Sequence, residues 1–75
     1  MNKLRQRFLD EVSDPNRQEA FRMMAVAVKL PKGAIETIVN YEDLPTKVQY
    51  YITAYDDEFL LKTNTSIEIV GFMLV

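Results

Sequence analysis

Residues 22–40 read RMMAVAVKLPKGAIETIVN, and this stretch decides the fold. Apolar side chains alternate between the two faces of an extended chain in its first and last parts. Between them, Pro31 suits the second position of a type I turn, and Gly33 suits the left-handed position that follows. The stretch therefore predicts a β-hairpin with strands over 22–30 and 34–40.

Both faces of the first predicted strand are largely apolar, which is typical of an interior strand. A helix running from Pro15 through Ala27 is the alternative, since methionine and alanine favour helices. The valines and the following turn favour the strand, but the sequence alone leaves residues 15–27 open between helix and strand. The two faces of the strand carry Met24, Val26, Val28 and Leu30 on one side and Met23, Ala25, Ala27 and Lys29 on the other.

Residues 3–13, before the hairpin, are predicted to form an amphipathic helix. Leu4, Phe8 and Val12 recur at four-residue steps, and Asn2 can cap the first turn. Asp14 and Pro15 then suit a new helix start, because aspartate caps well and proline fits the first helical position. We expect a short helical turn over 15–20.

Residues 41–45 are predicted to open a second helix, with the acidic Glu42 and Asp43 at its positive end and Pro45 in its first turn. It reaches Tyr55, and an extension to Lys62 is open. The residues expected on its buried stripe are Val48, Tyr51, Ile52, Tyr55 and Phe59. A polar turn over 63–66 and a strand over 67–75 follow.

The sequence thus predicts one α+β domain over 1–75, with the order α-β-β-α-β. A right-handed crossover between strands gives a three-stranded sheet of order 2-1-3, with the helices packed on one face and the last strand at an edge. The opposite face is expected to lack a cover inside the chain. We expect that face to carry some of Met23, Ala25, Ile38, Phe72 and Leu74.

The composition offers little for catalysis. There is no histidine and no cysteine, and the two glycines cannot build a phosphate-binding loop. Ser13 and Ser66 lie in turn-like segments with no base implied nearby. We therefore expect no enzyme activity and no cofactor.

The chain is expected to be cytoplasmic. It has no apolar run near the roughly 20 residues that span a bilayer, and Asp10 and Glu11 interrupt any signal-like segment after the basic N-terminus. The absence of cysteine fits a reducing compartment, since secreted domains of this size are usually cross-linked.

Charge is unevenly distributed along the chain. Residues 1–33 carry seven basic and four acidic side chains, whereas residues 34–75 carry two basic and seven acidic ones. The acidic balance disfavours nucleic acid as a partner. The acidic run 56–58 is not expected to bind a metal ion, because consecutive helical side chains diverge and further ligands are missing.

Three sets of residues are candidates for contact with other molecules. The predicted partner-binding site is an outward-facing group on the second helix, formed by Tyr50, Thr53 and Asp57. Exposed tyrosine often anchors protein interfaces. The apolar last strand is the predicted oligomer interface, through Ile69, Phe72, Met73, Leu74 and Val75. An anionic ligand would meet the basic side chains of Lys3, Arg5, Arg7 and Arg22.

The second half of the chain resembles small proteins encoded in phages and prophages of Gram-positive bacteria. The similar segments are Tyr50-Tyr51, residues 54–57, residues 61–64 and residues 67–75. The resemblance implies expression in a bacterial host and a role in phage propagation or in the modulation of host proteins. It implies no site residue.

We expect the protein to act by protein–protein contact, as a homo-oligomer that modulates a host or phage protein. The alternative is an oligomer that binds or sequesters a small ligand such as a nucleotide signal. An enzyme and a nucleic-acid-binding protein rank below these two hypotheses.

Overall fold

The computed structural model describes residues 2–18 and 21–75, whose elements follow the order α-β-β-α-β-β. A single helical turn, α2, follows the first helix. The elements are α1 (Lys3–Ser13), α2 (Pro15–Gln18), β1 (Met24–Lys29), β2 (Ile35–Asn40), α3 (Leu44–Ala54), β3 (Leu60–Leu61) and β4 (Asn64–Leu74).

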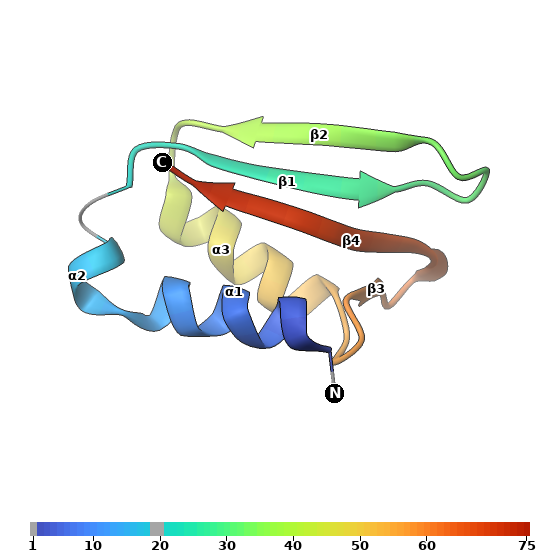
Figure 1. Cartoon of the computed structure of the whole chain (residues 1–75), viewed down its shortest axis with the longest axis horizontal. Helices are drawn as coiled ribbons and strands as arrows, with labels where there is room; N and C mark the ends of the chain where they lie inside the picture. The colour runs from blue at the N-terminus through green and yellow to red at the C-terminus, as the bar shows by residue number, and fades with distance from the viewer. Residues whose placement is uncertain (1, 19–20) are drawn as a thin grey trace.

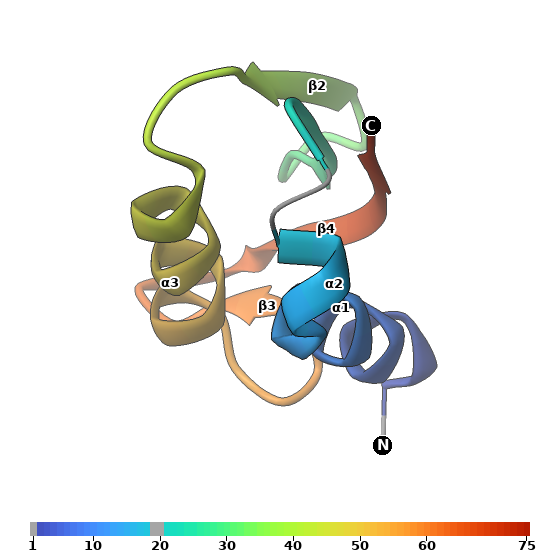
Figure 2. The ribbon, with the colours of Figure 1, turned by 90° about the vertical axis from the view of Figure 1, so that its left-hand side faces the viewer.

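The four strands form one antiparallel sheet of order β2-β1-β4-β3. Helices α1 and α3 lie on the same side of it (Figure 1), and the sheet curves around them when seen along the strands (Figure 2). The predicted α+β class and the neighbours of β1 are confirmed. The three-stranded sheet of order 2-1-3 is wrong in one respect: β3 adds a fourth strand beside β4. A two-residue strand leaves no alternating pattern by which the sequence could reveal it.

The hairpin forms as predicted. The N–H of Gly33 donates to the carbonyl of Leu30 at 2.9 Å, and the N–H of Leu30 donates to the carbonyl of Ala34 at 2.7 Å. Gly33 has a φ of 92°, which a side chain would disfavour. Because β1 begins at Met24, residues 24–27 are strand and not helix. The predicted turn over 15–20 is helical over Pro15–Gln18, and residues 19–20 lie outside the described part of the chain.

Helix α1 begins with the predicted cap. The side chain of Asn2 accepts a hydrogen bond from the N–H of Arg5 at 2.9 Å, and its amide donates to the carbonyl of Glu58 at 3.0 Å. One residue thus closes the first turn of α1 and ties it to the segment before β3. Phe8 and Val12 on the predicted stripe are buried.

Helix α3 ends at Ala54, so it does not continue to Lys62. The chain instead turns back on itself, and the carboxylate of Asp56 accepts hydrogen bonds from the N–H groups of Glu58 (2.9 Å) and Leu60 (3.0 Å). Phe59 closes this turn with a left-handed φ of 60° and is 1% exposed. The ring lies in the core although it is not on the helix.

A β-bulge in β4 reverses the faces of its two halves. Ala27 pairs with Gly71, but Val28 pairs with Ile69, so Val70 is an extra residue opposite β1. As a result Ile69 lies on the helix side together with Phe72 and Leu74, which pair with Val26 and Met24. The expectation that Ile38, Phe72 and Leu74 lie on the uncovered face is therefore wrong; Ile38 pairs with Val26 and also faces the helix side.

The core lies between the sheet and the two helices, and edge-to-face aromatic contacts run through it. Phe8 packs against Phe59 at 5.8 Å and against Phe72 at 5.1 Å between ring centroids, and Phe59 packs against Tyr55 at 6.4 Å. The buried cluster comprises Phe8, Val12, Met24, Val26, Val28, Tyr51, Tyr55, Phe59 and Ile69.

The turn before β3 gives a test of the fold. We expect Asp56→Ala to lower the free energy of unfolding by about 1–2 kcal/mol, because two backbone N–H groups lose their acceptor. Asp57→Ala is the matched control: its side chain is 95% exposed, and we expect a change within about 0.5 kcal/mol. Urea unfolding of both variants measures the difference, and equal losses would contradict this role of Asp56.

Candidate functional site

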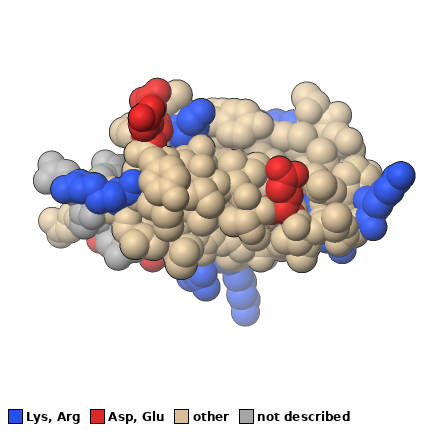
Figure 3. Space-filling model, turned by 90° about the horizontal axis from the view of Figure 1, so that it is seen from above, with Lys and Arg blue, Asp and Glu red and all other residues tan. Residues whose placement is uncertain are grey.

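The side of the sheet away from α1 and α3, here called the open face, carries exposed apolar side chains. Ile35, Val39, Met73 and Val75 are between 42% and 63% exposed on it. Seen from above in Figure 3, much of the surface is uncharged; Lys and Arg lie mainly toward its outline, and Asp or Glu atoms stand at its upper left and to the right of its middle. The register places on this face Ala25, Ala27 and Lys29 of β1, Ile35, Thr37 and Val39 of β2, and Glu68, Gly71 and Met73 of β4, followed by Val75.

Small residues make a shallow hollow in the open face. Ala27 and Gly71 face each other across β1 and β4, and the hollow of about 250 Å³ lies between Thr37 and Met73. Its lining is apolar apart from the hydroxyl of Thr37.

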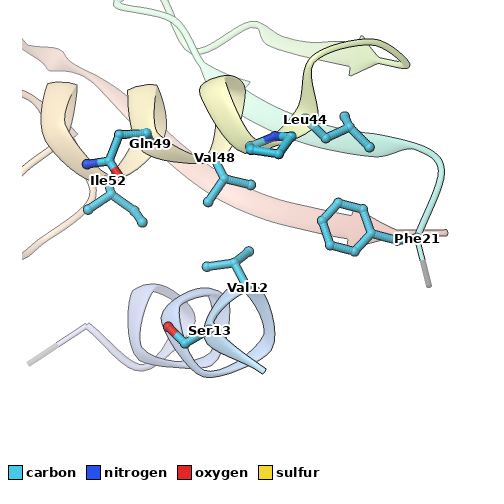
Figure 4. A pocket seen from close by; sticks show the side chains of 8 residues that line it. Val12, Ser13, Phe21, Leu44, Val48, Gln49 and Ile52 are labelled. Carbon is cyan, nitrogen blue, oxygen red and sulfur yellow. The ribbon is translucent and has the colours of Figure 1, made fainter. Parts of the chain in front are cut away.

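A second concave surface lies between the helices. A groove of about 360 Å³ separates the end of α1 from the first turns of α3, and its wall is largely apolar, with Ser13 and Gln49 as polar members (Figure 4). The residues that line it are Val12, Ser13, Phe21, Leu44, Pro45, Val48, Gln49 and Ile52. The sequence pattern does not reveal this groove, because it assigns these apolar residues to the core without showing that α1 and α3 diverge.

Three tyrosines cluster on α3 and just after it. Tyr50 packs edge-on against Tyr51 at 5.2 Å and Tyr55 at 6.5 Å. Burial raises the pKa of the Tyr51 hydroxyl; the Asn40 side chain partly offsets this by stabilising the ionised form, and Tyr50 adds to the rise. The Asn40 amide nitrogen makes no hydrogen bond of regular geometry. Burial also raises the pKa of Tyr55, and the charges of the neighbouring Tyr50 and Tyr51 raise it further.

The predicted partner-binding residues do not share one helical face. Tyr50 and Thr53 are exposed on α3, and the Thr53 hydroxyl donates to the carbonyl of Gln49 at 2.9 Å. Asp57 lies beyond the end of the helix, where its carboxylate is 3.6 Å from the guanidinium of Arg5. Tyr50 and Thr53 remain a surface pair, and Asp57 belongs to the turn region.

The predicted oligomer interface is divided between the two sides of the sheet. Ile69 is 2% exposed and belongs to the core, so it offers no contact surface. Phe72 and Leu74 are half-buried on the helix side. Met73 and Val75 alone of the five stand exposed on the open face.

The predicted anion-contacting residues do not converge within the chain. Lys3, Arg5 and Arg7 lie on α1, whereas Arg22 precedes β1, whose first residues lie at the other end of the molecule from the start of α1 (Figure 1). Arg5 faces Asp57, and the guanidinium of Arg7 stacks over the ring of Phe72 at 5.1 Å. An anion on α1 would therefore compete with a carboxylate and an aromatic ring.

Across residues 2–18 and 21–75, no group of three potential metal-ligating side chains is brought together. In the same part of the chain, no helix combines the length and apolar character of a membrane span. Comparison with family models, curated proteins and solved structures finds no match for this chain.

The buried tyrosines predict a loss of stability at alkaline pH. Above the ordinary pKa of 10.0 the unfolded chain releases phenol protons that the folded chain retains, because both folded pKa values are raised. The free energy of unfolding should therefore fall as the pH rises above 10. Urea unfolding across this range measures the fall.

The variant that carries both Tyr51→Phe and Tyr55→Phe should show a shallower fall than the parent. Tyr41→Phe is the control, since its ring is 68% exposed and contributes no buried phenol. Parallel profiles for the double variant and the parent would show that these two hydroxyls do not cause the pH dependence.

Proposed function

We propose that this chain is a non-enzymatic module that acts by protein–protein contact, with a homo-oligomer as its working form. The observation that supports the proposal is the open face together with the free strand β2 beside it. Monomeric proteins usually keep contiguous exposed apolar surface small, and a larger patch beside an unpaired strand is typical of a protein interface.

The geometry of the sheet explains why this surface is available. Both helices pack on one side, and the two short helices leave nothing to cover the other (Figure 2). On the open face Ala25 is buried between its register partners Val39 and Met73. A protein layer or strand added here would remove Val39 and Met73 from water, at a gain of roughly 25 cal/mol per Å² of apolar area.

A wider role in modulating a second protein of a bacterial host or phage belongs to the same proposal. Its support is the resemblance of the C-terminal half to small phage and prophage proteins. The hollow in the open face and the groove between the helices are mostly apolar, which suits protein contact better than the binding of a charged metabolite.

Sedimentation velocity at micromolar concentration tests the oligomer. We expect the parent to sediment as a multiple of its 8.7 kDa mass. Val39→Lys should shift the population toward the single molecule, because a lysine there places a charge on the open face and at the strand edge. Circular dichroism checks that the variant is folded.

Tyr41→Lys is the matched control. It also replaces an exposed apolar residue by lysine, but Tyr41 follows the last residue of β2 and is outside the open face. It should leave the sedimentation of the parent unchanged. A folded parent that sediments as a lone molecule at these concentrations would overturn the proposed function.

A further inference from the structure

The backbone groups of β1 point alternately to its two neighbours. Met23, just before β1, exchanges both backbone hydrogen bonds with Val75, each at 3.0 Å. Odd-numbered residues of β1 therefore bond toward β4 and even-numbered ones toward β2, because the direction alternates along a strand. The bond from Leu30 to Ala34 on the β2 side follows the same rule.

This alternation shows which backbone N–H and C=O groups of β2 do not bond to β1. Val28 pairs with Glu36 and Val26 with Ile38, so the even residues of β2 bond to β1. The N–H and C=O groups of Ile35, Thr37 and Val39 therefore point away from the sheet, on the side where none of the described strands lies. The three side chains belong to the open face.

Edges that must stay unpaired usually carry lysine, proline or a bulge. Residues Ile35–Asn40 contain neither lysine nor proline, and the register with β1 runs without a shift. Glu36 is the one charged side chain of the strand. Apart from Glu36, the edge of β2 thus lacks the features that prevent pairing with another strand.

We propose that β2 pairs antiparallel with β2 of a second copy of this chain, around a two-fold axis at Thr37. Thr37 then meets Thr37 of the second copy, and Ile35 meets Val39 on either side of it. Each of these pairs exchanges two bonds, giving about six new hydrogen bonds. Threonine–threonine and apolar pairs directly opposite each other favour such a ribbon. The inference rests on the proposed function and specifies the contact that forms the oligomer.

The register at Thr37 is the one that uses every outward group. Moving the axis to Glu36 places two like charges directly opposite each other, which destabilises a strand pair. Moving it to Ile38 leaves Ile35 opposite residue 41, beyond the end of β2. With the axis at Thr37, Glu36 lies opposite an isoleucine.

Charge on the open face also favours the edge over face-to-face stacking. Lys29 pairs with Glu68 on this face, at the end of β1 farthest from Met23. A copy stacked on the whole face would bury both groups, and the desolvation of such a pair often exceeds its attraction. Pairing at the edge leaves both in water and joins two four-stranded sheets into one continuous sheet.

Single cysteines test the register, since the chain contains none of its own. In the proposed dimer the Cα atoms of the two Thr37 residues lie about 5.5 Å apart, within reach of a disulfide. The two Ile35 residues lie roughly 14 Å apart, because they are offset by four residues along the strand. We expect rapid oxidation to a covalent dimer with Thr37→Cys, and none with Ile35→Cys or Val39→Cys alone; these two mixed together should cross-link.

A charge exchange provides a second measurement that does not depend on disulfide geometry. Thr37→Lys and Thr37→Glu should each shift the sedimentation to the single molecule, because like charges then face each other at the axis. Mixing the two variants should restore the dimer.

The outcomes separate the two proposals. An oligomeric parent without cross-linking at Thr37, or with cross-linking centred on Glu36→Cys or Ile38→Cys, overturns the proposed register and leaves the proposed function standing. Failure of the mixed Lys and Glu variants to recombine, while each remains folded, also overturns it. A parent that sediments as a lone folded molecule overturns both.

Discussion

Phe59 holds the two helices and the C-terminal strands together. Its ring is in contact with Tyr55, just after α3, and with Phe8 of α1, while its carbonyl accepts the N–H of Ile69 in β4 at 2.9 Å. A left-handed backbone costs a residue with a side chain about 1–2 kcal/mol. Burial of a phenylalanine returns about 1.5–3 kcal/mol, so the strained turn is stable only because the ring is buried.

Building the core around that ring determines what remains outside. Where β1 and β4 pair, the side chains that face the helices are all bulky, whereas the small residues Ala25, Ala27 and Gly71 face away, together with Lys29 and Met73. A chain of 75 residues has too little apolar material to bury both sides of a sheet well. The open face follows from this limit, because α1 and α3 both contribute to the single core.

Much of this arrangement could be predicted from local sequence. The hairpin was predictable because Pro31 and Gly33 each have a distinct backbone preference. The caps at Asn2 and Asp14 were also predictable, and their side chains accept from Arg5 and Asn16 at 2.9 Å. These features depend on contacts only a few residues apart in the chain.

The parts that could not be predicted depend on distant partners. The bulge at Val70 exists only relative to β1, and it moves Ile69 from the side of Met73 to the side of Phe72. Strict alternation along residues 67–75 therefore assigns the faces of the strand incorrectly. β3 and the interhelical groove likewise follow from how α1 and α3 are placed in space. Because of the bulge in β4, only Met73 and Val75 of the predicted oligomer interface lie on the open face.

The two edges of the sheet, β2 and β3, differ in how much backbone they offer for pairing with another chain. β3 is two residues long and pairs with the outer side of the first half of β4. This edge of the sheet therefore offers little backbone for pairing. β2 offers a six-residue edge that is exposed along nearly its whole length. Hydrogen bonds give a strand pair its affinity but little selectivity, and selectivity comes from the side chains beside them. On β2 those side chains are apolar except for Glu36, Thr37 and Asn40. A second copy of β2 carries the same side chains, so its polarity matches that of the first along the pair.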